Sequence, residues 1–199
     1  MDDFRTTDVR PANTTLVYSF RLSKNRLAFW GLNAGSFVLL LVFGWFFIWY
    51  LTLVRPDFAR DFLPGSISPL VLLAWLLGVF VGQLLLHESI HGAFFWMYTR
   101  RRPKFGFRGW YAFAAAPGWY FPRREYMVIT LAPFALFSIL GMILLAGLPV
   151  GALLPVLLAA IVNAASSVGD LWISVKLFFA RGSVIVEDLG DGMDFYTLN

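Results

Sequence analysis

Long apolar runs dominate the chain, and short polar or basic segments separate them. Four runs reach the roughly 20 residues that a helix needs to cross a bilayer, and they extend over about residues 27–54, 69–98, 126–148 and 153–180. Backbone that faces lipid must satisfy its hydrogen bonds within the segment, so each run is predicted to be a helix. The pattern predicts an all-α integral membrane protein of one domain, with four transmembrane helices.

Two shorter stretches have a different pattern. Apolar and polar residues alternate over residues 15–23, which is typical of a strand. Near the end of the chain, residues 184–186 and 195–196 flank a turn at 190–192 and predict a hairpin. Short interfacial strands or loops are therefore expected beside the helices.

Composition supports membrane insertion and argues against nucleic-acid binding. Hydrophobic residues make up 59% of the chain, the mean hydropathy is +0.70, and 14% of residues are charged, whereas soluble domains average about 25% charged. The net charge of +4 comes from short loops beside apolar runs, where basic residues set topology and contact anionic lipid headgroups. We therefore expect the lipid bilayer, and no nucleic acid, as a partner. Cysteine is absent, which excludes disulfides and thiolate ligands.

The loops differ strongly in charge. Residues 99–125 contain seven basic residues against Glu125 alone, and basic residues also precede the first run and follow the fourth. Residues 55–68 are balanced, with Arg55 and Arg60 against Asp57 and Asp61, and no charge lies between the third and fourth runs. The positive-inside rule places segments 1–26, 99–125 and 181–199 in the cytoplasm. We therefore expect a multi-pass protein of the cell membrane with both termini cytoplasmic.

The second apolar run contains the pattern H-E-x-x-H, in which His87, Glu88 and His91 are the fixed positions. Residues four apart lie on one face of a helix, about 6 Å apart along its axis. Two imidazoles in this arrangement can bind one Zn²⁺, and the carboxylate beside them can act as a general base toward water. His87 and His91 are therefore candidate zinc ligands, and Glu88 is a candidate catalytic residue.

A motif this short also arises by chance, and polar residues in a membrane can simply join helices by hydrogen bonds. Three features favour the metal site. His87 and His91 are the only histidines in the chain, they lie in an apolar run, and Asp170 is the one further acid deep in such a run besides Glu88. Ionisable groups are costly in hydrocarbon and are usually functional there.

Asp170 is the candidate third ligand because its depth matches that of the histidines. His87 and His91 lie 13 and 9 residues before Arg100, and Asp170 lies 11 residues before Arg181. At about 1.5 Å per residue, all three are roughly 13 to 20 Å from the cytoplasmic ends of their runs. A His₂-Asp set leaves the fourth zinc position for water. The alternative is an isolated buried carboxylic acid that stays neutral.

Asn163 is a further candidate catalytic residue. It precedes Asp170 by seven residues, which is about two helical turns, so the two lie on a similar face. Its amide could donate a hydrogen bond to the oxyanion that develops in peptide hydrolysis. Asparagine also joins packed helices by hydrogen bonds, and the sequence leaves both interpretations open.

These motifs give the chain a family resemblance. H-E-x-x-H at 87–91, followed two runs later by Asn163 and Gly169-Asp170, resembles the site-2 protease type of intramembrane metalloprotease. More closely, residues 69–196 resemble a bacterial and archaeal family of small integral-membrane zincin peptidases. The site-2 pattern has a proline between the Asn and the Asp and a glycine after the Asp, where this chain has no proline and Leu171.

The resemblance implies a three-helix zinc-protease core formed by the second, third and fourth runs. It implies zinc ligation by His87, His91 and Asp170. It also implies that Glu88 is the catalytic base and that Asn163 aids the oxyanion.

The middle loop, residues 109–121, is apolar and interrupted by glycine and proline. One interpretation is a re-entrant or edge-strand element beside the zinc site, to which an extended substrate adds as a strand. The other is an interfacial belt in which Trp110, Tyr111, Trp119 and Tyr120 lie at the level of the headgroups. The two interpretations are compatible with each other.

The sequence favours a zinc-dependent intramembrane metallopeptidase that hydrolyses peptide bonds of a membrane-protein or peptide substrate within or near the membrane. The alternative is a catalytically inactive membrane protein that keeps a structural zinc and acts by interaction. Structural zinc sites usually have four protein ligands, and no cysteine or third histidine is available to complete one. A metal transporter usually shows repeated halves, and we find no internal repeat.

Overall fold

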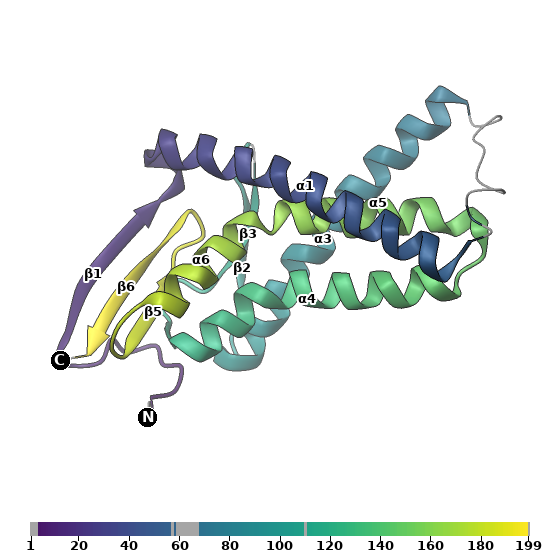
Figure 1. Ribbon diagram of the computed structural model, residues 1–199. Helices are drawn as coiled ribbons and strands as arrows, with labels where there is room; N and C mark the ends of the chain where they lie inside the picture. Colours follow the sequence, from purple (N-terminus) through teal and green to yellow (C-terminus); the bar gives the residue numbers. More distant parts are fainter. Residues whose placement is uncertain (1–3, 57, 59–67, 110, 199) are drawn as a thin grey trace. The chain divides into compact units, whose positions relative to one another are not determined.

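The computed structural model describes residues 4–56, 58, 68–109 and 111–198. Most of these residues are helical (Figure 1). The helices are α1 (Arg26–Val54), α3 (Pro69–Thr99), α4 (Arg123–Gly147), α5 (Val150–Ser166) and α6 (Val168–Phe179), with a short 3₁₀ helix, η1, at Leu22–Lys24. The helices predicted at 27–54, 69–98 and 126–148 are confirmed as α1, α3 and α4.

The fourth predicted helix, at 153–180, is broken. Helix α5 ends at Ser166, α6 begins at Val168, and the pair is bent by 45°. The hydroxyls of Ser166 and Ser167 both donate to the carbonyl oxygen of Asn163, at 3.0 and 2.8 Å. Hydroxyls that bond the carbonyl of the preceding turn bend a helix. Because of the break, Asp170 lies in the first turn of α6.

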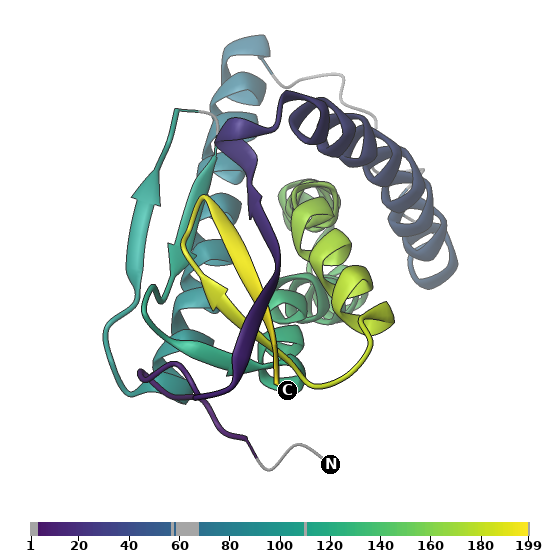
Figure 2. The same cartoon turned by 90° about the vertical axis from the view of Figure 1, so that its left-hand side faces the viewer.

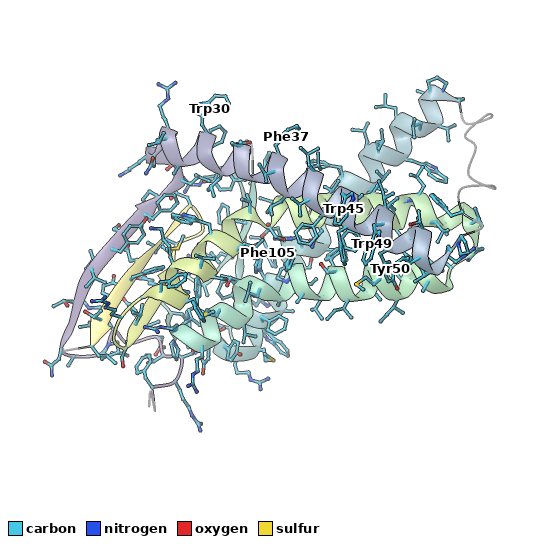
Figure 3. All side chains as sticks on the ribbon, in the orientation of Figure 1. Trp30, Phe37, Trp45, Trp49, Tyr50 and Phe105 are labelled. Atoms are coloured by element: carbon cyan, nitrogen blue, oxygen red, sulfur yellow. The ribbon has the colours of Figure 1, made fainter. Side chains whose placement is uncertain are left out.

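Helices α1, α3 and α4 are long and apolar enough to cross a membrane, and the bent pair α5–α6 makes a fourth span if it crosses as one. The structure describes every residue of α1, and only Phe47 and Leu51 are buried in this helix. Trp30 and Phe37 project outward from the same helix (Figure 3). Exposed apolar surface of this extent is compatible with contact to lipid.

The chain forms two compact units. Unit 1 comprises residues 1–32, 88–133 and 169–199, and unit 2 comprises residues 33–87 and 134–168. Each unit has a hydrophobic core of its own. In unit 2 the core joins Phe47 and Leu51 of α1 to Leu145 of α4 and to Leu153 and Leu157 of α5.

Unit 1 contains a four-stranded antiparallel sheet in the order β1-β6-β5-β4 (Figure 1). Its strands are β1 (Thr14–Arg21), β4 (Tyr120–Pro122), β5 (Val184–Asp188) and β6 (Gly192–Leu198). The strand predicted at 15–23 and the C-terminal hairpin are confirmed. The prediction of an all-α fold was incomplete, because these short strands join into one sheet.

Two further strands, β2 (Lys104–Phe107) and β3 (Ala112–Ala115), pair as an antiparallel hairpin in the same unit. Figure 2 shows them as teal strands apart from the purple and yellow strands β1 and β6. The ring of Phe105 packs where a side chain at Gly92 of α3 would lie. The middle loop thus contains strands, as one of its two interpretations predicts. Trp110 of the predicted aromatic belt lies outside the described residues, as do Asp57, Arg60 and Asp61.

Candidate metal centre

Helix α3 carries the H-E-x-x-H motif without interruption. His87 and His91 are one turn apart and 5% and 7% exposed, whereas Leu85 and Leu86 beside them are 63% and 58% exposed. The two imidazoles therefore occupy one protected face of the helix, as the spacing of four residues predicts. Glu88 follows His87 on the same turn and is half-buried.

In unit 1, His91 is held between α4 and α6. Its Nδ1 lies 2.9 Å from the carbonyl oxygen of Ile129, and its Nε2 lies 3.4 Å from Oδ1 of Asp170. A carbonyl oxygen only accepts hydrogen bonds, so Nδ1 carries the proton and donates it. Nε2 is then the ring nitrogen that faces Asp170.

In unit 2, His87 contacts the amide of Asn163 on α5. The Nδ1 atom of His87 is 2.9 Å from Oδ1 of Asn163. The same oxygen accepts a hydrogen bond from Nε2 of Gln83 at 3.2 Å, which agrees with its assignment as the amide oxygen. His87 therefore also donates through Nδ1, and Nε2 is the ring nitrogen that could bind a metal ion.

The structure brings three of the candidate side chains together. His87, His91 and Asp170 each offer one ligand atom, and these atoms all lie within 4.8 Å of one another. His87 takes this place because α3 continues through one turn from it to His91. The role of the three side chains as ligands remains a prediction.

The donor set fits Zn²⁺. Two imidazole nitrogens and one carboxylate oxygen are common zinc ligands. In metal-binding histidines the other ring nitrogen almost always donates a hydrogen bond to an oxygen atom, which fixes the tautomer, and both His87 and His91 do so here. Asp170 lies at the N-terminus of α6, where the helix dipole favours a negative charge.

The sequence argument missed Gln83, which lies one turn before His87 and is 3% exposed. The sequence contains a pattern that could have identified it, because Gln83, His87 and His91 follow one another at intervals of four residues in an apolar run. The structure also shows that the oxygen of Asn163 faces His87. The expected contribution of the Asn163 amide to an oxyanion stays a prediction.

Comparison with known proteins identifies the family of the chain. Residues 80–185 match the model of the family described as "Putative zincin peptidase". The match covers just over half of the chain and includes all the candidate site residues. No curated protein matches the chain, and no solved structure matches it. The likeness to site-2 proteases rests on the motif alone. The chain belongs to the family that this model describes.

Proposed function

We propose that this protein is a zinc-dependent metallopeptidase that hydrolyses peptide bonds within or beside a membrane. The observation that carries the proposal is the group of ligand atoms from His87, His91 and Asp170, all within 4.8 Å of one another. Membership of the zincin family supports peptidase chemistry. The long apolar helices support a membrane location.

The side chains have separate tasks in this proposal. A bound Zn²⁺ would act as a Lewis acid that polarises the scissile carbonyl group and makes water more acidic. His87 and His91 would hold the ion through Nε2, since the Nδ1 atoms are engaged with Asn163 and Ile129. The carboxylate of Glu88 would accept a proton from the attacking water and pass it to the leaving amine.

The position of the hairpin β2–β3 favours a substrate that binds in an extended conformation. Phe105 of β2 packs at Gly92, the residue after His91, so the hairpin lies close to a candidate ligand within unit 1. Phe105 and Phe107 are exposed on β2. We propose that a membrane-protein or peptide substrate adds to this hairpin as a strand. An extended substrate presents its carbonyl groups, which a helical peptide keeps in hydrogen bonds.

Charge and hydropathy support the membrane location and its orientation. The basic residues of 99–125 contrast with the uncharged segment between α4 and α5, which supports a cytoplasmic position for that loop and for both termini. We propose that the protein is a multi-pass protein of the cell membrane.

Glu88→Gln tests the chemistry. The amide cannot accept a proton as the carboxylate does, so we expect kcat/KM to fall about 10²–10⁴-fold while the zinc content stays unchanged. The measurement is cleavage of a peptide library by purified protein in detergent, with zinc determined on the same samples.

Glu125→Gln is the matched control, because it removes a carboxylate of the same unit away from the motif. We expect this variant to keep its activity. Cleavage by Glu88→Gln at the wild-type rate would contradict the proposal. Bound zinc without cleavage of any substrate would favour the inactive structural alternative.

A further inference from the structure

Gln83 is a buried amide on the apolar helix α3, and the proposed chemistry does not use it. It lies one turn before His87, and 3% of it is exposed. A buried amide is costly unless its polar atoms are hydrogen-bonded. The Nε2 group makes two hydrogen bonds, to Ser166 at 3.1 Å and to Asn163 at 3.2 Å, both in unit 2.

The directions of these bonds can be followed from the end of α5. The hydroxyl of Ser166 donates to the backbone carbonyl of Asn163 at 3.0 Å. Its single proton is then used, so toward Gln83 the Ser166 oxygen can only accept. This requires the NH₂ group of Gln83, and not its oxygen, to face Ser166 and Asn163.

The hydrogen bonds continue from Gln83 through Asn163 to His87, which is a candidate ligand. Because Gln83 presents a donor, Asn163 must present Oδ1 to it, and the same oxygen faces Nδ1 of His87 at 2.9 Å. His87 must then carry a proton on Nδ1, so that Nε2 is the nitrogen through which the neutral ring can bind a metal ion. If the Asn163 amide turned over, its NH₂ group would select the opposite tautomer, with the proton on Nε2.

We propose that Gln83 is a positioning residue for His87, which it holds through Asn163 in the tautomer that can bind a metal ion through Nε2. The oxygen of Gln83 has no hydrogen-bond partner among the described residues, so its orientation is set from the NH₂ side alone. The link to metal binding rests on the proposed function, whereas the tautomer is a property of the metal-free protein.

The first experiment measures that tautomer directly. The chain has two histidines, so selective ¹⁵N-histidine labelling of metal-free protein in detergent gives resolved signals for both rings. We expect Nδ1–H for both histidines in the wild type. In Gln83→Met, which keeps the volume but has no donor, His87 should become a mixture of tautomers. His91 donates to the Ile129 carbonyl and serves as the internal control.

The second experiment measures zinc affinity by competition with a chelator. Loss of a group that orients a ligand typically weakens metal binding about 10–100-fold, and we expect a loss in this range for Gln83→Met. Since Gln83 acts through Asn163, adding Gln83→Met to Asn163→Ala should cause little further loss. Leu157→Ala, in the core of the same unit, should lower stability but leave the affinity unchanged.

The outcomes separate the two proposals. If wild-type protein binds no zinc, the proposed function fails, while the tautomer of His87 still decides the role of Gln83. An unchanged tautomer in Gln83→Met would overturn the inference. Zinc affinity that falls equally in Leu157→Ala would also overturn it, because the effect would then be one of folding.

Discussion

At the scale of single residues, neighbouring groups hold the candidate ligands in position, and only some of these groups can be recognised from the sequence. The H-E-x-x-H motif identifies His87 and His91, and matching depth identifies Asp170. The acceptor for His91 is the backbone carbonyl of Ile129. Any residue at this position supplies the same oxygen, so the sequence carries no sign of it.

Asp188 makes the stability of unit 1 depend on pH. Its carboxylate accepts hydrogen bonds from the Tyr126 hydroxyl at 2.6 Å and the Gly190 N–H at 2.8 Å, and burial raises the pKa of Asp188 from 3.8 to about 6. The folded protein therefore binds this proton more tightly than the unfolded chain. The contribution of Asp188 to the free energy of unfolding is fully present below about pH 4 and declines as the pH rises to about 6.

Asp188→Asn should remove this contribution. We expect the unfolding temperature in detergent, plotted against pH, to fall less steeply between pH 4 and 6 than in the wild type, by the equivalent of about 1–3 kcal/mol over the interval. Asp8→Asn, at an exposed acid, controls for the loss of a charge. Equal slopes in wild type and Asp188→Asn would show that the buried carboxyl does not behave in this way.

At the scale of elements, hydropathy locates helices but does not show where one breaks. The fourth apolar run continues through Ser166 and Ser167 with no proline at the break, so the sequence predicted one helix there. The bend comes from hydroxyl groups that return to the carbonyl of Asn163. Serine can bond in this way or point elsewhere in a helix, and the choice depends on packing.

Gly92 fixes the contact between α3 and the hairpin β2–β3. An added Cβ would overlap the Phe105 ring and lie close to Pro103, so we expect Gly92→Ala to destabilise the protein by about 1–3 kcal/mol. Gly82→Ala, on the same helix with no atoms near the added Cβ, should not destabilise it. The measurement is the thermal unfolding midpoint in detergent.

A double-mutant cycle identifies the cause. With Phe105→Ala already present, adding Gly92→Ala should cost much less, because the overlapping ring is gone. An identical cost in both backgrounds would mean that the hairpin does not pack on α3 as described.

At the scale of the whole molecule, local patterns predicted the spans but not the main sheet. An apolar run of about 20 residues specifies a membrane helix by itself. Strand β1, in contrast, pairs with β6 from the other end of the chain, with Thr14 opposite Leu198. Such a pairing leaves no trace in the local alternation of either strand, so only the separate strands could be predicted.

The predicted orientation can be tested with single cysteines, because the chain has none of its own. In intact cells, an impermeant maleimide should label Pro149→Cys, between α4 and α5, and should not label Asp8→Cys or Arg181→Cys near the termini. All three positions are exposed. Labelling of either terminal position without permeabilisation would contradict the positive-inside assignment.

The central claim is that His87, His91 and Asp170 hold one zinc ion, and metal content tests it most directly. Purified wild-type protein and Glu88→Gln should each contain about one zinc per chain, since three protein ligands with an open position define a catalytic site. His87→Ala, His91→Ala and Asp170→Ala should lose the ion, whereas Asp194→Ala, at an acid paired with Arg21 in the sheet, should retain it. Full zinc occupancy in Asp170→Ala, or none in the wild type, would contradict the account.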